Sequence, residues 1–412
     1  MYPQVQTDTR KLVAGELFFA LSGDNFNGNQ FALQAIEKGA AYAVVDEDID
    51  PDNAQLIFVE NALFALQQLA KFHRQQFNIP FIGITGSNGK TTTKELVHAV
   101  LSSHFITYTT KGNLNNHIGV SLTLLSIKKD AQMAIIEMGA NHQQEIAGYC
   151  TYALPTHGVI TNCGKAHLEG FGGVEGVKKG KGELFDYMRA NDGTAFIFNE
   201  YNYLRQMAHD LPVIEYGTTN GDVMGTALEG EPFLQVAVTQ PFAATIKTNL
   251  VGNYNLPNLL CAVAIGNHFG VPAHKIINGL QLYQPENSRS QMVISGSNNI
   301  ILDAYNANPN SMALAIKNIA ALQASNKVLV LGAMNELGAE SLKEHQAILD
   351  LINLYSWKKV ALVGGDFSKL THTYHYFVTV NEAAEWYRQQ YFKNTYQLIK
   401  GSRSYKMEQV LG

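Results

Sequence analysis

The glycine-rich segment GSNGKTTT at 86–93 holds the residues with the clearest capacity for chemistry. Gly86 and Gly89 can adopt backbone conformations closed to other residues, so that successive N–H groups point at phosphate oxygens. Lys90 would neutralise the β- and γ-phosphates of a nucleotide, and the Thr91 hydroxyl would bind Mg²⁺. The residues that we expect to contact a nucleotide here are Gly86, Ser87, Asn88, Gly89, Lys90, Thr91 and Thr92.

The neighbours of this loop are those that a phosphate-binding loop requires. The apolar run FIGIT at 81–85 predicts a buried strand, and KELVHAVL at 94–101 predicts a helix whose N-terminus faces the loop. The usual G-x-x-x-x-G-K-[ST] pattern is broken at its first position by Ile84. The alternative is a glycine-rich turn without a ligand. A loop of this kind does not by itself distinguish a kinase, an ATPase, a GTPase and a ligase.

Three residues downstream could complete a site for metal and phosphate. Glu137 ends the apolar run MAIIE, where a carboxylate beside a phosphate loop can hold Mg²⁺, although a cap or a salt bridge would also explain it. His167 lies in a glycine-rich loop after the apolar run HGVIT. A lone histidine in a loop is usually a surface residue. Because His167 follows a further predicted strand beside the same site, a functional role is favoured. Lys181 lies on a predicted helix, where an exposed lysine is the usual case.

The length of 412 residues exceeds what one hydrophobic core supports, so several domains are expected. Short apolar runs alternate with helical patterns, which predicts an α/β fold with a central P-loop ATPase-type parallel sheet and a Rossmann-like C-terminal domain. In the last block the predicted strands are IILDA, KVLVLG, KVALVGG and YQLIKG. The predicted domains are residues 1–78, 79–290 and 291–412.

The composition excludes several classes of protein. A formal net charge of −5 without a basic stripe argues against nucleic-acid binding. The cysteines Cys150, Cys163 and Cys261 have no CxxC spacing, so reduced, buried thiols are expected rather than a zinc site or disulfides. No apolar run approaches the ~20 residues of a membrane span, and MYPQVQTDTRKL at the start lacks a signal core. We therefore expect a cytoplasmic protein without a membrane span.

The order of motifs along the chain resembles the Mur ligase family. These motifs are TGSNGKTTTKEL, GNLNNHIGVSLTLL, IIEMGAN, AHLEGFGGVEGVKKGKGELF, VGNYNLPNLLCA, LDAYNANPNSM, LGAMNELGAESLKEH and LIKGSRSYKMEQVL. DAYNANP, LGAMNELG and KGSR together are similar to the branch that adds D-alanyl-D-alanine to UDP-N-acetylmuramoyl-tripeptide. The resemblance implies an ATP-dependent ligase of peptidoglycan precursor synthesis that works through an acyl phosphate. It further implies a UDP-substrate domain, an ATP domain and an acceptor domain, in that order.

The resemblance also implies a role for each matched residue. The catalytic residues would be Lys90, Glu137, His167 and Lys181. One Mg²⁺ would be held by Thr91 and Glu137, and a second by His167 and Lys181. For this purpose Lys181 would first react with CO2 to form a carbamate. The remaining nucleotide-binding positions are Asn255 and Asn258 at adenine, Arg289 at phosphate and Asp303 at ribose. The substrate-binding positions are Thr9, Arg10, Asn115, Asn116, Asn306 and Asn308.

The chain departs from the family pattern at a few positions. Tyr254 or Asn253 stands where relatives usually have histidine, and Ala333 where many have aspartate. The segment TDTRKL lies nearer the start than in relatives, which predicts a trimmed start or a reduced UDP pocket. Two alternatives remain: a relative that adds single amino acids, and a nucleotide-binding regulatory protein without turnover. The third residue of the tripeptide, lysine or diaminopimelate, is not indicated, and a monomer is the simplest expectation.

Overall fold

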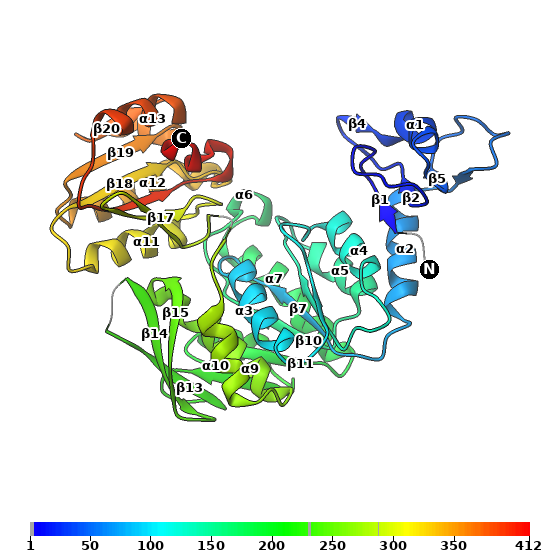
Figure 1. Ribbon diagram of the computed structural model, residues 1–412, viewed down its shortest axis with the longest axis horizontal. Coiled ribbons are helices and arrows are strands. Elements are labelled where there is room, and N and C mark those ends of the chain that lie inside the picture. Colours follow the sequence, from blue (N-terminus) through cyan, green and yellow to red (C-terminus); the bar gives the residue numbers. More distant parts are fainter. Residues whose placement is uncertain (1–3, 230–231, 287) are drawn as a thin grey trace.

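The computed structural model describes residues 4–229, 232–286 and 288–412. Within these residues the strands form a four-stranded, a nine-stranded and a six-stranded sheet and a two-stranded hairpin, and we name the three larger ones the N-terminal, central and C-terminal sheets. In Figure 1 the N-terminal sheet lies at the upper right, the C-terminal sheet at the upper left, and the central sheet below both. The α/β class with several parallel-dominated sheets is confirmed.

The N-terminal sheet is parallel, in the order β1-β2-β5-β6. Because successive side chains of a strand point to opposite faces, the neighbours Phe18 and Phe19 of β2 enter two different cores. Phe18 packs with Ala32 and Ala35, and Phe19 packs with Leu66 of the following helix α2. The elements of this part are β1 Val5–Gln6, β2 Leu17–Phe19, the hairpin strands β3 Ser22–Gly23 and β4 Phe26–Asn27, η1 Gly28–Phe31, α1 Ala32–Glu37, β5 Tyr42–Val45, β6 Leu56–Phe58 and α2 Ala62–Arg74.

The central sheet has the order β15-β14-β13-β12-β11-β10-β7-β9-β8. Its strands from β8 to β13 pair in parallel, and helices cover both faces, so β7 and β9 are apolar on both sides. Its strands are β7 Phe81–Thr85, β8 Thr107–Thr109, β9 Met133–Glu137, β10 His157–Ile160, β11 Thr194–Phe198, β12 Val213–Gly217, β13 Val223–Leu228, β14 Phe233–Gln240 and β15 Ala244–Val251. Its helices are α3 Lys90–Ser102, α4 His117–Leu125, α5 Glu145–Ala153, α6 Leu168–Phe171, α7 Val174–Ala190, α8 Asn202–Met207, η2 Asn253–Asn255, α9 Leu256–His268 and α10 Ala273–Leu282.

An antiparallel extension at one edge of this sheet was not predicted. Strands β13, β14 and β15 pair antiparallel, and β14 alternates between buried and partly exposed residues over FLQVAVTQ. This alternation is typical of an antiparallel strand with one covered face, whereas the parallel strands β7 and β9 are buried throughout. The prediction of a parallel sheet therefore holds for the part that leads to the phosphate loop.

The C-terminal sheet has the order β16-β17-β21-β18-β19-β20, parallel except for the antiparallel edge strand β16. Helix α11 begins with a capping box, in which Asn308 and Ser311 exchange side-chain and backbone bonds, followed by a proline in its first turn. The elements are β16 Gln291–Ser295, β17 Asn298–Asp303, α11 Pro309–Ala321, β18 Lys327–Gly332, η3 Gly338–Glu340, α12 Ser341–Asn353, β19 Lys359–Val363, η4 Gly365–Lys369, β20 His375–Phe377, α13 Val380–Gln389, β21 Tyr396–Lys400, η5 Arg403–Tyr405 and η6 Met407–Leu411.

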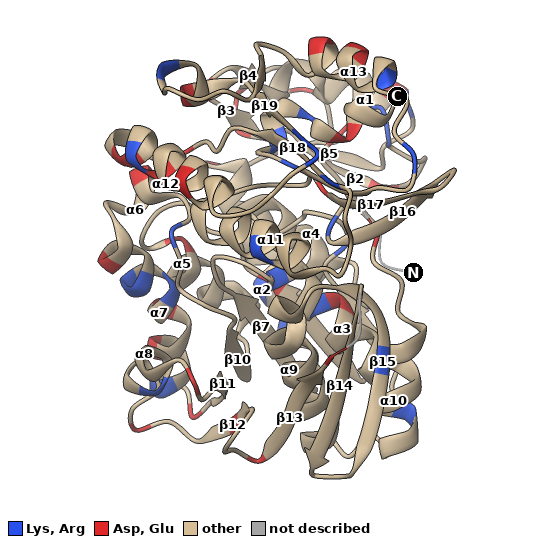
Figure 2. Ribbon diagram, turned by 90° about the vertical axis from the view of Figure 1, so that its left-hand side faces the viewer, with Lys and Arg blue, Asp and Glu red and all other residues tan. Residues whose placement is uncertain are grey.

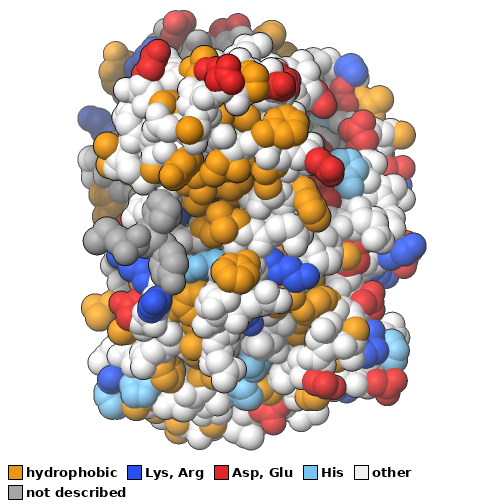
Figure 3. Space-filling model, turned by 90° about the vertical axis from the view of Figure 1, so that its right-hand side faces the viewer, with side chains coloured by type: hydrophobic (Ala, Val, Ile, Leu, Met, Phe, Trp, Pro, Cys, Tyr) orange, Lys and Arg blue, Asp and Glu red, His pale blue; other side chains and the backbone are white. Residues whose placement is uncertain are grey.

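The outer surface of the N-terminal part is rich in exposed apolar side chains. Figure 3, which faces the right-hand side of Figure 1, shows apolar side chains gathered over the upper half of that face. Exposed aromatic residues of this part include Phe26, Phe58, Phe64 and Phe72. None of the described helices combines the length and apolarity needed to cross a membrane.

A buried arginine joins the end of α2 to the central sheet. The Arg74 guanidinium donates hydrogen bonds to the carbonyl oxygens of Ala153, Leu154 and Phe77, at 3.1, 2.9 and 2.9 Å. Its carbon Cζ also lies 3.6 Å from the ring centroid of Phe81, the first residue of β7. Arg74 therefore fixes the segment that carries the chain from the N-terminal part into the strand before the phosphate loop.

We expect Arg74→Ala to lower the free energy of unfolding by about 2–4 kcal/mol, because three buried carbonyl groups lose a charged donor. Urea denaturation followed by circular dichroism measures this. The exposed neighbour Gln75 provides the control, since Gln75→Ala should change stability by less than about 0.5 kcal/mol. Equal effects of the two substitutions would contradict the anchoring role.

Candidate active site

A cavity of about 700 Å³ opens at the carboxyl ends of the central parallel strands. In α/β sheets this is the edge at which ligands bind. The phosphate loop and the segments that follow β9 and β10 form one wall, and residues of the C-terminal part, among them Asp303, Asn308, Asn335 and Lys400, form another. The cavity therefore lies between the central and C-terminal sheets, and residues from distant parts of the chain reach it.

The phosphate loop has the backbone geometry that its glycines predict. Gly86 and Gly89 have φ angles of 141° and 79°, in the region that favours glycine. A Cβ atom on Gly86 would lie 2.0 Å from the Thr161 hydroxyl oxygen. The Lys90 Nζ atom donates to the Gly86 carbonyl oxygen at 2.6 Å, so the ammonium is held against the loop. Burial lowers the pKa of Lys90 to about 8, although the negative charge of Glu137 acts to raise it.

The segment after β10 braces this loop. The Thr161 hydroxyl donates to the Asn88 carbonyl oxygen at 2.6 Å, and the Asn88 backbone N–H donates to the Asn162 side chain at 3.0 Å. Ser87 is held in the same way, because its hydroxyl donates to the Gly164 carbonyl oxygen at 3.0 Å. These contacts fix the loop before any phosphate binds, and neither Thr161 nor Asn162 was predicted as a site residue.

Glu137 is the buried acid of the cavity. Its side chain is 1% exposed. Its Oε1 accepts hydrogen bonds from the Thr91 hydroxyl at 3.0 Å and from the Asn115 amide at 2.7 Å. Its Oε2 has no hydrogen-bond partner within the described part of the chain and lies 4.0 Å from the Nζ atom of the fully buried Lys94. A buried carboxylate oxygen without a donor is a position at which a cation would be bound favourably.

The oxygen donors around Glu137 fit Mg²⁺. Magnesium prefers hard oxygen ligands and usually keeps waters and substrate phosphates in its shell. Glu137 supplies a carboxylate oxygen and Thr91 a hydroxyl, beside the loop that would hold the phosphates. Among the described residues, no group of three or more His, Cys, Asp and Glu side chains could share a metal ion. Any metal here would thus depend on phosphate oxygens and water for most of its ligands.

His167 lines the same cavity and lies against the C-terminal part. Its Nδ1 atom is 2.6 Å from the Oε2 atom of Glu336, in the loop that follows β18. The histidine beside it holds the pKa of the Glu336 carboxyl below its ordinary value. His167 immediately precedes α6, which lies below α12 of the C-terminal part in Figure 2. The contact between His167 and Glu336 was not predicted, because the two positions lie 169 apart in the sequence.

Lys181 is 1% exposed, contrary to the usual behaviour of a helix lysine. Its Nζ atom donates to the Ala140 carbonyl oxygen at 3.0 Å and lies 4.8 Å from the ring centroid of Phe171. Burial lowers the pKa of Lys181 to about 7, and the nearby charge of Lys90 contributes to this shift. Lys181 does not line the cavity itself, but its partner Ala140 does.

Glu183 has a structural role, since it accepts hydrogen bonds from the backbone N–H groups of Gln144 and Ala147 at the start of α5.

The predicted adenine-side asparagines are buried at one end of the cavity. The Asn258 amide donates to the Asn255 side-chain oxygen at 3.0 Å, and its own oxygen accepts from the Thr93 hydroxyl at 3.1 Å. Tyr254 also lines the cavity, and its hydroxyl lies 3.0 Å from the Ser290 hydroxyl oxygen. The hydrogen bond between Asn255 and Asn258 fixes both amide groups, so these side chains have little freedom to rearrange around a bound base.

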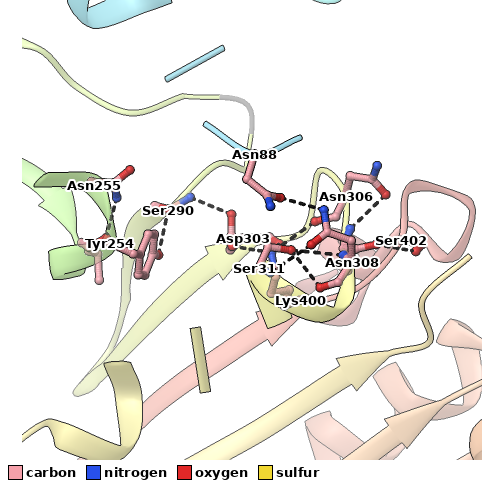
Figure 4. A network of polar contacts seen from close by, with 12 residues as sticks. Asn88, Tyr254, Asn255, Ser290, Asp303, Asn306, Asn308, Ser311, Lys400 and Ser402 are labelled. Atoms are coloured by element: carbon pink, nitrogen blue, oxygen red, sulfur yellow. Dashed lines mark hydrogen bonds and ion pairs between the residues drawn. The ribbon is translucent and has the colours of Figure 1, made fainter. Parts of the chain in front are cut away.

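A buried ion pair organises the C-terminal wall (Figure 4). The Lys400 Nζ atom, on a side chain that is 2% exposed, lies 2.5 Å from the Oδ2 atom of Asp303, and Oδ1 accepts from the Ser290 backbone N–H at 3.1 Å. Lys400 also donates to the Asn306 carbonyl oxygen at 3.2 Å. Arg289 lies with its Cζ atom 3.5 Å from the ring centroid of Tyr305. Lys400 is a cavity residue that we did not predict, although the KGSR motif begins with it.

The other predicted substrate residues fall into two groups. Asn115, Asn116, Asn306 and Asn308 line the cavity. Asn308 connects its walls, since its amide donates to the Asn88 side-chain oxygen of the phosphate loop at 2.7 Å. Thr9 and Arg10 lie in the N-terminal part and do not line the cavity; Arg10 pairs with Asp8 at 2.8 Å on the surface. Their role in binding a UDP group stays a prediction.

Family models match almost the whole chain. Residues 2–76 match "Mur ligase family, catalytic domain", residues 84–266 match "Mur ligase middle domain" and residues 288–403 match "Mur ligase, glutamate ligase domain". Among curated relatives, the UDP-N-acetylmuramoyl-tripeptide–D-alanyl-D-alanine ligase of Bacillus subtilis is 37% identical over 81% of this chain and 74% of its own. The enzyme of the same name from Escherichia coli is 36% identical over 87% of this chain and 81% of its own.

Solved structures agree in fold. A crystal structure of MurF from Acinetobacter baumannii has a TM-score of 0.90 and 31% sequence identity, and the match covers 99% of this chain and 92% of that one. The MurF ligase of Thermotoga maritima, solved in complex with ADP, has a TM-score of 0.89 at 24% identity, with 99% and 96% of the two chains covered. The latter comparison extends the similarity of fold to a distant sequence.

We expect Lys90→Ala to weaken the binding of magnesium–ATP by about 10-fold to 100-fold, because the phosphates lose a charge-assisted contact in a partly buried site. Isothermal titration calorimetry measures this affinity. Lys179→Ala, which removes an exposed lysine from α7, is the matched control and should leave it unchanged. Retention of full affinity by Lys90→Ala would contradict the assignment of the phosphate loop.

Proposed function

The chain belongs to the Mur ligase family, and we propose that it uses ATP to join D-alanyl-D-alanine to UDP-N-acetylmuramoyl-tripeptide in peptidoglycan precursor synthesis. Three curated relatives that are 37%, 36% and 36% identical to this chain carry the name of this reaction. The observation that supports the proposal best is the single cavity that contains Lys90, Thr91, Glu137 and His167 beside the C-terminal sheet.

The reaction consists of two displacements. A terminal carboxylate oxygen of the tripeptide attacks the γ-phosphorus of ATP, the bond to the β-phosphate oxygen breaks, and ADP leaves. The amine nitrogen of the dipeptide then attacks the acyl carbon, the bond from that carbon to the phosphate oxygen breaks, and phosphate leaves. The ammonium group gives up two protons to solvent and phosphate over the second displacement. Both displacements need charge neutralisation and alignment rather than a nucleophile from the protein.

The residues of this chain provide those two requirements. Lys90 is held against the loop carbonyl groups, so its positive charge stands where the terminal phosphates would lie. Thr91 and Glu137 would hold a Mg²⁺ ion, and His167 would hold a second. Bound magnesium would neutralise negative charge that develops on the phosphate oxygens. Asn255 and Asn258 would contact the base, and Arg289 and Asp303 would contact phosphate and ribose; all four residues line the cavity.

We further propose that Lys181 carries a carbamate. Reaction with CO2 requires a neutral amine, and the buried Lys181 has its pKa lowered to about 7. Carbamylation would replace a positive charge next to Lys90 by an anion with oxygen ligands, which magnesium prefers. This would remove the repulsion between the buried Lys181 ammonium group and the nearby Lys90, and would account for the burial of a lysine at this position.

We place the domain boundaries at 1–78, 79–290 and 291–412, for the UDP-substrate, ATP and acceptor domains. The ends of the three family matches, 2–76, 84–266 and 288–403, are compatible with this division. Thr9 and Arg10 would then contribute to the UDP-substrate domain. A cytoplasmic monomer fits a reaction whose substrates are charged and nucleotide-linked.

A substrate matrix tests the function. We expect phosphate release from ATP only when UDP-N-acetylmuramoyl-tripeptide and D-alanyl-D-alanine are both present, measured with a coupled phosphate assay. Free D-alanine, L-lysine and glutamate should not replace the dipeptide. Turnover with a single amino acid would indicate another branch of the family. The absence of turnover with every pair, while ATP still binds, would favour the alternative of a regulatory protein.

For Lys181 we expect a carbamate signal in ¹³C nuclear magnetic resonance after incubation with labelled CO2. At fixed dissolved CO2 the signal should grow between about pH 6 and about pH 8, because the amine is protonated below its lowered pKa and neutral above it. The signal should be absent from Lys181→Ala and present in Lys179→Ala, in which an exposed lysine of the same helix is removed. Identical spectra for these two variants would exclude the carbamate.

The activity of the same variants gives a second measurement. Lys181→Ala should lose at least about 100-fold in kcat with little change in thermal stability, as expected for the loss of a transition-state interaction. Acetate or formate should restore part of that activity by supplying carboxylate oxygens in the vacated space. Neither acid should help Lys90→Ala, whose missing group is a cation. Equal rescue of both variants would count against the assigned roles.

A further inference from the structure

A second cavity, of about 340 Å³, adjoins the first. Both cavities are lined by Asn335 and Glu336, so they meet at this pair of residues. The remaining lining residues of the second cavity are Met334, Leu337, Gly338, Ser341, Gly365 and Asp366. The second cavity thus belongs to the C-terminal part and opens toward the end of the active site where His167 lies.

The position of this cavity in the C-terminal sheet is that of a ligand site. Its walls are the loops that follow β18 and β19, two neighbouring parallel strands. The carboxyl ends of such strands are where open α/β sheets bind their ligands. Met334 and Leu337 are buried apolar side chains, and Asn335 is fixed by bonds to the hydroxyl groups of Ser402 and Ser404 at 2.9 and 2.7 Å. The cavity is therefore small, and mainly polar groups face it.

Two carboxylates line the cavity, and they differ in their partners. Asp366 is paired with Lys369 at 2.7 Å, and a hydrogen bond with Ser341 contributes to the lowering of its pKa. The Glu336 side chain is 51% exposed, and the contact that pairs it with another charged group is the one with His167 at 2.6 Å. Glu336 therefore presents a negative charge at the junction of the two cavities, next to the phosphate end of the active site.

We propose that the second cavity receives the acceptor dipeptide and that Glu336 binds its α-ammonium group. This rests on the proposed function, in which an amine must approach the acyl carbon that forms near Lys90 and His167. A nucleophile reacts fastest when it is held at about 3–3.5 Å from its target. The junction is the place where a group bound in the second cavity comes nearest to the first. The Glu336 carboxylate at this junction attracts an ammonium group, and a cavity of about 340 Å³ suits a dipeptide with short side chains.

The variant Glu336→Gln tests this assignment, because it keeps the shape of the side chain and removes the charge. We expect the KM for D-alanyl-D-alanine to rise by about 10-fold or more, as for the loss of a charged partner. The KM values for ATP and for UDP-N-acetylmuramoyl-tripeptide should change by less than about two-fold. The matched control is Glu340→Gln, which removes a carboxylate of the next short helix that pairs with Lys343 at 2.9 Å and lines neither cavity.

A second measurement separates acceptor binding from an effect through His167. Hydroxylamine intercepts acyl phosphates as hydroxamates and needs no dipeptide site. Without D-alanyl-D-alanine, hydroxamate formation from ATP and the UDP-tripeptide therefore measures any effect that Glu336→Gln exerts through His167, and the loss of kcat/KM for the dipeptide should exceed that loss by about 10-fold or more. If the two losses were equal, or if Glu336→Gln kept the wild-type KM for the dipeptide, the proposal would be wrong. If wild type itself formed neither hydroxamate nor ligated product, the proposed function would fail instead.

Discussion

Burying a carboxylate costs several kcal/mol unless donors and cations surround it, and this constraint explains the arrangement around Glu137. Thr91 and Asn115 bond to one of its oxygens, while the other faces the buried Lys94 at 4.0 Å. Lys94 is itself held by the carbonyl oxygen of Thr110 at 2.7 Å, in the loop that precedes Asn115. The phosphate loop, helix α3 and the segment after β8 are therefore tied to the end of β9 by one charge, and a cation bound there would complete its shell.

Polar contacts also connect the separate parts of the chain. The C-terminal part contacts the central part through polar pairs at the cavity: Asn308 with Asn88, Glu336 with His167, and Glu344 with Lys165 at 2.5 Å. Each pair joins a residue of the central part to a residue of the C-terminal part. Such contacts are individually weak when exposed and stronger when they are shielded from water. The position of the C-terminal part is thus coupled to the geometry of the phosphate loop.

Much of this arrangement followed from local sequence. The strands that carry the site are continuous apolar runs, and the glycines of the phosphate loop require φ angles that few other residues adopt. The antiparallel strands β13–β15 were missed, although FLQVAVTQ alternates as expected for such a strand. Lys94, Glu336 and Lys400 were missed for another reason. A lysine or glutamate is usually exposed, whether on a helix, at the end of a strand or in a loop, and its burial or its partner depends on chain segments far away in sequence.

Asp303 shows how one residue can serve both the fold and the ligand. Its two oxygens are already engaged, by Lys400 and by the Ser290 backbone N–H, yet each carboxylate oxygen accepts more than one hydrogen bond. Ser290 follows directly after Arg289, in the segment that leads from the central part into β16. A ligand hydroxyl bound to Asp303 would therefore meet an acid whose orientation is fixed by the connection between the two parts. The binding of such a ligand and the placement of the C-terminal part would then depend on the same ion pair.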